Sequence, residues 1–155
     1  MGSALARISS LITCFVLLAA VAFGQPLPAK PKKLVNDYAG VLAPQNVQAL
    51  ERKLVAYSDS TSTQIAIVIE KYLENDDAFD RSFKIADAWG IGGAKNDNGV
   101  LIYVAVDNRK IFIQTGYGVE DRLTDAMTKR IIEQVVVPNF RSGQYYNGLD
   151  RATSI

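Results

Sequence analysis

Residues 100–106 read VLIYVAV, an unbroken apolar run rich in β-branched side chains. Residues 63–69, TQIAIVI, have almost the same character. A strand with one wet face alternates apolar and polar residues, whereas a strand covered on both faces is apolar throughout. The two runs therefore predict central strands of a sheet that lies between two layers of helices.

Helical segments precede and separate these two strands. Residues 44–58 start with Pro44, a favourable first-turn residue, and carry apolar side chains at spacings of three and four. Residues 78–89 follow Asp76 and Asp77, either of which can cap a helix. The spacing within this second helix directs several apolar residues toward the core, namely Phe79, Phe83, Ala86 and, as a further candidate, Trp89.

The following segment predicts a hairpin and two more helices. A tight turn leads to residues 110–115, which alternate and return antiparallel. Thr124 caps a helix that runs to about residue 136 and is ended by Pro138, and a last helix begins near Tyr145. The expected fold is α/β, a three-layer α/β/α sandwich around a small mixed sheet with one βαβ unit and a β-hairpin.

The first 33 residues are set apart from this domain. Residues 1–24 combine a short basic start, an apolar run and a small-x-small site before Gln25, which predicts a secretory signal peptide. The apolar run is shorter than the roughly 20 residues of a membrane-spanning helix. Residues 25–33, with three prolines and three lysines, predict an extended, solvated linker, and residues 34–155 form the domain.

Composition excludes several kinds of chemistry. The 155-residue chain has no His and a single Cys, and Cys14 lies within the predicted signal peptide. The mature chain therefore has no Ser-His-Asp triad, no imidazole zinc site, no thiol nucleophile and no disulfide. The 17 Lys and Arg residues balance 16 Asp and Glu residues, which argues against nucleic acid as a partner.

Six short segments, in their order and spacing, resemble one known family. The chain is similar to the TPM domain family, named for a thylakoid lumen protein, a photosystem II repair protein and a receptor-associated membrane protein. The resemblance covers residues 34–155 and rests on VNDYAGVL (35–42), WGIG (89–92), KNDNGVLI (95–102), NRK (108–110), QTGYGVE (114–120) and LTDA (123–126).

The resemblance implies a Rossmann-like domain in an exported bacterial protein, periplasmic or at the cell surface. It also implies links to divalent cations, especially calcium, to acid phosphatase activity and to the repair or assembly of membrane complexes. Bacterial relatives often continue into a membrane helix or a Gly-rich tail. We therefore expect a truncated domain end and a possible membrane anchor beyond residue 155, where the last helix has no cap.

Oxygen ligands are concentrated at the predicted turns, and Ca²⁺ or Mg²⁺ prefers such ligands. Without His or Cys, these cations are favoured over Zn²⁺. The same residue types also form turns and cap helices without a bound metal, so a purely structural role for them is the alternative. An EF-hand is excluded because Ala94 and Ala105 would occupy its carboxylate positions. We expect one cleft with the metal ligands Asp37, Asp97, Asn98, Glu120, Asp121 and Asp125.

Two other functions compete with cation binding. A metal-dependent phosphomonoesterase would use Asp97 and Asp125 as metal ligand or base, with Lys95 and Arg109 gripping the phosphate. A protein-interaction module would use the acidic loops only to bind a partner. A dinucleotide site at Gly116 is excluded, because its third glycine is missing and neighbouring carboxylates would repel a pyrophosphate.

Overall fold

The computed structural model describes residues 24–155, so the predicted signal peptide lies outside the described residues except for Gly24. The strands are β1 (Val35–Asp37), β2 (Gln64–Glu70), β3 (Gly99–Ala105) and β4 (Lys110–Thr115). The helices are α2 (Pro44–Thr61), α3 (Ala78–Trp89), α4 (Gly93–Asn96), α5 (Asp125–Ile131), α6 (Val137–Arg141) and α7 (Tyr145–Ala152), with a 3-10 turn η2 (Tyr117–Val119) and a π turn η3 (Ile132–Val136).

The four strands form one mixed sheet in the order β1-β2-β3-β4. β1 and β3 both run parallel to β2, and β4 returns antiparallel to β3. The predicted βαβ unit and hairpin are therefore confirmed. The edge strand β1 was not predicted, because three residues are too few to show a periodicity; it pairs Val35 with Ile67.

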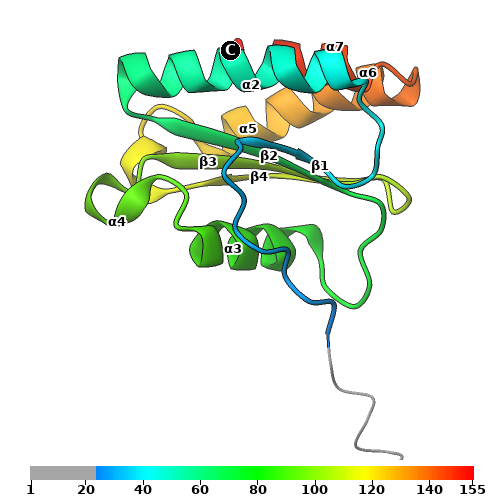
Figure 1. Ribbon diagram of the computed structural model, residues 1–155, viewed down its shortest axis with the longest axis horizontal. Coiled ribbons are helices and arrows are strands. Elements are labelled where there is room, and N and C mark those ends of the chain that lie inside the picture. The colour runs from blue at the N-terminus through cyan, green and yellow to red at the C-terminus, as the bar shows by residue number, and fades with distance from the viewer. Residues whose placement is uncertain (1–23) are drawn as a thin grey trace, which may run out of the picture.

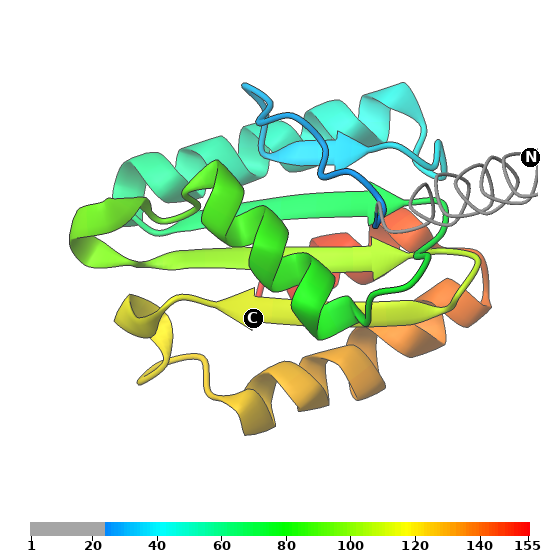
Figure 2. The ribbon, with the colours of Figure 1, turned by 90° about the horizontal axis from the view of Figure 1, so that it is seen from below.

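Helices cover both faces of the sheet, which confirms the three-layer sandwich (Figure 1). α2 and the helices from α5 to α7 lie on one face, and α3 lies on the other (Figures 1 and 2). Alternate residues of β2 and β3 enter the two cores: Ile67 and Ile102 pack toward α2, whereas Val68 and Tyr103 pack toward α3. Burial on both faces explains why these strands carry no polar alternation.

The orientation of α3 corrects the sequence prediction. Asp77 caps the helix as expected, its Oδ1 accepting a hydrogen bond from the Asp80 N–H at 2.8 Å. Phe79 and Phe83, however, remain 50% and 54% exposed. The face that packs on the sheet carries Ala78, Ser82, Ile85 and Trp89. The prediction was wrong for Phe79 and Phe83, which dominate the apolar pattern although smaller residues face the sheet. It was confirmed for Trp89, which is buried, and for Ala86, which packs against the same core.

The helix after Thr124 does not end at Pro138. Thr124 caps α5 as predicted, but the chain continues through the π turn η3 into α6. The wider turn places Pro138 in the first turn of α6, where no amide hydrogen is required. The Asn139 side chain donates to the Val135 carbonyl at 2.7 Å and helps to satisfy the backbone there.

Residues 25–28 are docked on the domain and are not a solvated linker. The carbonyl oxygens of Gln25 and Pro26 accept hydrogen bonds from the Arg81 guanidinium at 2.8 and 2.9 Å. The Trp89 indole N–H donates to the Pro28 carbonyl at 2.8 Å. We call this segment the strap; it passes α3 on its way to β1 (Figure 1). Within residues 24–155, no helix has the length and apolarity that crossing a membrane requires.

Candidate functional site

The predicted site residues lie at two opposite ends of the sheet. β1, β2 and β3 are parallel, so their carboxyl ends lie at the same end of the sheet. Asp37 at the end of β1 and Arg109, which precedes β4, both lie there. Asp97 and Glu120 lie at the opposite end of the sheet, where the seven-residue strand β3 begins. A strand of that length spans about 20 Å. The single cleft expected from the sequence is therefore not formed, and Asp37 is separated from Asp97.

Asp37 holds a turn of its own chain. Its Oδ1 accepts hydrogen bonds from the N–H groups of Ala39 and Gly40 at 3.1 and 2.8 Å. Its Oδ2 accepts from the Leu42 N–H at 2.8 Å. This carboxylate satisfies three backbone donors between β1 and α2, which is the turn-forming alternative that the sequence left open.

A groove lies at the end of the sheet that carries Asp97, between α3, the end of β4 and the segment GIGGAKNDNG (90–99), which we call the Gly-rich loop. Its cavity is about 590 Å³, within the range of small-molecule sites. The carboxylates of Asp87, Asp97 and Glu120 line it, and no Lys or Arg side chain does among the described residues. We call it the acidic groove. Phe79, Phe83 and Tyr117 supply aromatic surface to the same cavity.

Two loops are joined closely behind this groove by glycine. A Cβ atom at Gly116 would overlap the carbonyl oxygen of Asp97, and one at Gly118 would overlap that of Asn96. The Gly118 N–H can therefore donate to the Asp97 carbonyl at 2.9 Å. The segments 95–102 and 114–120, remote in sequence, thus meet because Gly116 and Gly118 have no side chain at the points of contact.

Asp97 is the C-cap residue of α4, and its N–H donates to the Gly93 carbonyl at 3.2 Å. Its φ of 43° lies in the left-handed region, which is uncommon for a residue other than glycine. Its Oδ2 accepts a hydrogen bond from the Tyr117 N–H at 3.1 Å. This hydrogen bond holds the carboxylate in place at the groove that Asp97 lines. Asp97 is therefore the best-positioned carboxylate of the acidic groove.

The other predicted ligands do not face the groove. The Asn98 amide donates to the Ser62 carbonyl at 2.6 Å, and Asn98 lines a different cavity together with Asp121. Asp125 begins α5 behind its cap Thr124. Of the six predicted metal ligands, the structure brings only Asp97 and Glu120 into the groove. Within residues 24–155, no group of three or more His, Cys, Asp or Glu side chains is close enough to hold a metal ion.

Asp87 is a groove residue that sequence reasoning missed. It follows Phe79 and Phe83 at intervals of four along α3, so the three share one helix face. That signal was available in the sequence, because an Asp on an apolar stripe indicates that the stripe is not buried. The phosphatase set is not assembled either: Lys95 is exposed on α4 and does not line the groove, and Arg109 lies at the opposite edge.

A buried ionic cluster under the strap also escaped the sequence reasoning. Arg81, only 1% exposed, binds Glu70 through two hydrogen bonds of 3.0 and 2.7 Å, and the Tyr103 hydroxyl donates to Glu70 at 2.7 Å. Burial and the hydrogen bond to Glu70 raise the pKa of Tyr103 well above its ordinary value. Burial lowers the pKa of Arg81, but Glu70 more than offsets this and raises it. The cluster is closed by the strap, so its role is structural.

Comparisons with known proteins agree with this fold. A family model described as the TPM domain matches residues 35–154. The N-terminal domain of a protein from P. gingivalis, solved by NMR, is 35% identical, with a TM-score of 0.73 over 80% of this chain and 79% of that one. BA42 from Bizionia argentinensis is 24% identical, with a TM-score of 0.64 over 75% and 79% of the two chains. Comparison with curated proteins gave no match.

Proposed function

This chain belongs to the TPM domain family, and we propose that it binds a divalent cation, Ca²⁺ before Mg²⁺, in the acidic groove. The observation that carries the proposal is the lining of the groove, with three carboxylates and no basic side chain among the described residues. Ca²⁺ takes oxygen ligands with flexible geometry, which carboxylates supply. We further propose an exported domain that acts at the cell surface or in the periplasm, in the maintenance or assembly of a membrane complex.

The donor set fits a weak site. Asp97 and Glu120 would hold the cation, and because no three acidic side chains of the described part are clustered, backbone oxygens and water would complete the shell. Sites with few charged ligands bind Ca²⁺ weakly, with dissociation constants of about 0.1–1 mM in extracellular modules. We therefore expect a cation response at millimolar concentrations.

A melting experiment tests this proposal. At about ten times the dissociation constant, Ca²⁺ should stabilise the protein by about 1.4 kcal/mol. Asp97→Asn and Glu120→Gln should each abolish most of this gain, whereas Asp59→Asn, an exposed carboxylate on α2, should keep it. The absence of any shift at millimolar Ca²⁺ and Mg²⁺, or an equal shift in Asp97→Asn, would rule out cation binding in the groove.

The aromatic rim favours protein binding as a second function. Tyr117 is 82% exposed, and the rings of Phe79 and Phe83 lie stacked 6.5 Å apart at the surface. Exposed aromatic clusters beside a groove are typical of interaction sites. This alternative predicts no cation response and unchanged partner capture in Asp97→Asn, with capture lost in Phe83→Ser. The phosphomonoesterase receives no such support, because no Lys or Arg of residues 24–155 lines the groove to hold a phosphate.

A further inference from the structure

A second cavity, of about 470 Å³, lies at the opposite end of the sheet from the acidic groove. It opens between the β3–β4 turn and the α6–α7 region. Its polar side chains include Arg109, Arg141 and Tyr145, and its apolar wall includes Val106, Ile111 and Phe140. No acidic side chain of the described residues lines it, so its charge is the reverse of that in the groove. We call it the basic pocket.

The backbone fixes the position of Arg109. The Asn108 side chain accepts a hydrogen bond from the Leu73 N–H at 2.7 Å and donates to the Leu73 carbonyl at 3.0 Å. This clamp ties the β3–β4 turn to the segment after β2. Arg109 itself has a φ of 52°, in the left-handed region, and its N–H donates to the Val106 carbonyl at 3.1 Å. The turn thus fixes the backbone from which the exposed Arg109 side chain extends.

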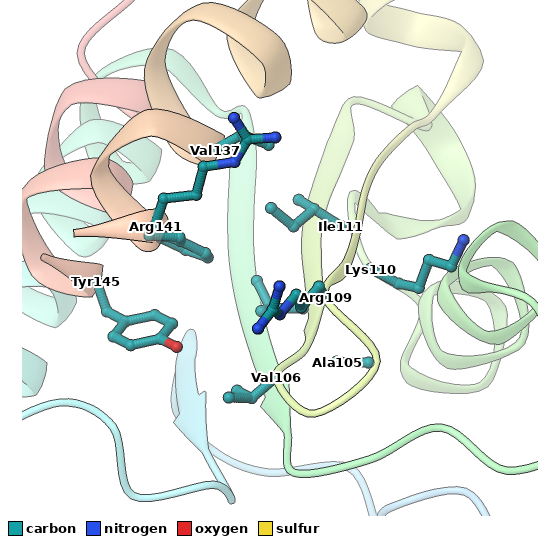
Figure 3. A pocket seen from close by; sticks show the side chains of 10 residues that line it. Ala105, Val106, Arg109, Lys110, Ile111, Val137, Arg141 and Tyr145 are labelled. Carbon is teal, nitrogen blue, oxygen red and sulfur yellow. The ribbon is translucent and has the colours of Figure 1, made fainter. Parts of the chain in front are cut away.

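The other polar groups come from a different part of the chain. Arg141 ends α6, and its side chain extends along the helices, away from Tyr145 and Arg109, so that it must turn to meet a ligand held by them (Figure 3). The Tyr145 hydroxyl at the start of α7 points toward the side of the pocket where Arg109 lies (Figure 3). The rings of Phe140 and Tyr145 lie 4.7 Å apart, so the tyrosine is supported by packing. Lys110 also lines the pocket, but its side chain extends away toward α3 (Figure 3).

The two arginines have charge available for a ligand. Neither Arg109 nor Arg141 belongs to any ion pair formed within residues 24–155. A guanidinium group is always protonated and presents parallel N–H donors that match the oxygens of a phosphate or carboxylate. The phenolic hydroxyl of Tyr145 adds one more donor.

We propose that the basic pocket binds an organic oxyanion, a phosphate, phosphonate or carboxylate attached to an apolar group. Arg109, Arg141 and Tyr145 hold the oxyanion, and the wall formed by Ile111 and Phe140 takes the apolar part. The volume suits a small molecule. The carboxyl ends of the strands form the crevice in which open α/β sheets bind ligands. The site is independent of cation binding, because the acidic groove lies at the other edge.

Titration with phenylphosphonate tests the proposal, since its carbon–phosphorus bond resists hydrolysis. With EDTA present, NMR shifts of the wild-type protein should appear at the amides of Ile111 and Tyr145. Arg109→Met and Arg141→Met should each weaken binding about tenfold or more. Arg52→Met, an exposed arginine on α2, should leave it unchanged. Shifts elsewhere, no binding, or equal affinity in all variants would overturn the proposal.

Further ligands identify the chemistry and its source. Inorganic phosphate should bind at least several-fold more weakly than phenylphosphonate, because it has nothing to place on the apolar wall; equal affinities would contradict an organic ligand. Benzoate tests the carboxylate form. Sedimentation with equimolar phosphatidylcholine and phosphatidic acid vesicles, lost in Arg141→Met, would assign the oxyanion to a lipid headgroup. Phenylphosphonate binding without sedimentation would assign it to a soluble metabolite.

Discussion

At the scale of single residues, Arg81 joins the strap to the sheet. Its guanidinium reaches Glu70 on β2 and the carbonyl oxygens of Gln25 and Pro26. Glu70 in turn accepts the hydrogen bond of Tyr103. Each polar group of this buried cluster has a hydrogen-bond partner, which compensates the free energy of its desolvation. Removal of one partner leaves the desolvation of the remaining groups uncompensated.

Arg81→Met should therefore destabilise the protein by about 3–5 kcal/mol, because Glu70 is left as an uncompensated buried charge. The double variant with Glu70→Met should recover part of that loss, since both charges are then removed. Urea unfolding of the two variants and the wild type measures this. A cost below about 1 kcal/mol for Arg81→Met would show that the strap and water replace the guanidinium.

At the scale of elements, the acidic groove depends on the close approach of the Gly-rich loop and the β4–η2 segment. Gly116 has no room for a side chain, because Asp97 occupies that space with its carbonyl and carboxylate oxygens. Asp97 is also the C-cap of α4, a position at which a left-handed conformation is common. The position of the carboxylate is thus a consequence of a glycine 19 residues later in the chain.

Gly116→Ala should separate these loops, lower stability by about 1–3 kcal/mol and abolish the Ca²⁺ response even though every carboxylate remains. Arg52→Ala, at an exposed position on α2, is the control. Thermal melting with and without Ca²⁺ gives both quantities. A fully retained Ca²⁺ shift in Gly116→Ala would mean that the position of Asp97 does not matter for the cation.

At the scale of the whole molecule, the two candidate sites have opposite charge at opposite ends of the sheet. The acidic groove lies at the start of β3 and the basic pocket at its end. The chain as a whole is nearly neutral, with a formal net charge of +1, so this separation is invisible in the composition. A sheet that is buried on both faces is a rigid spacer between them.

The two sites should therefore act independently. Stabilisation by Ca²⁺ and by phenylphosphonate should add within about 0.5 kcal/mol, because sites more than about 10 Å apart without shared partners are additive. Melting with each ligand alone and with both measures the sum. A large deviation from additivity would instead indicate coupling through β3 or a shared binding site.

The sequence alone was sufficient for the central layers of the fold. Apolar runs at 63–69 and 100–106 predicted β2 and β3, and the periodicity and capping residues located α2 and α3 within a few residues. These signals are local, because burial on both faces and the start of a helix leave a pattern in neighbouring residues. The resemblance to the TPM domain was confirmed by the family match over residues 35–154.

Only the tertiary structure decided which side chains meet. The sequence grouped Asp37 with Asp97 because both lie at predicted turns. Asp37, however, ends β1 and Asp97 precedes β3, so the parallel direction of β1, β2 and β3 places them at opposite ends of the sheet. It assigned Phe83 to the core and residues 25–28 to solvent, whereas Arg81 and Trp89 hold the strap on the domain. The physical reason is that strand direction, register and long-range hydrogen bonds involve residues far apart in the chain, which no local pattern records.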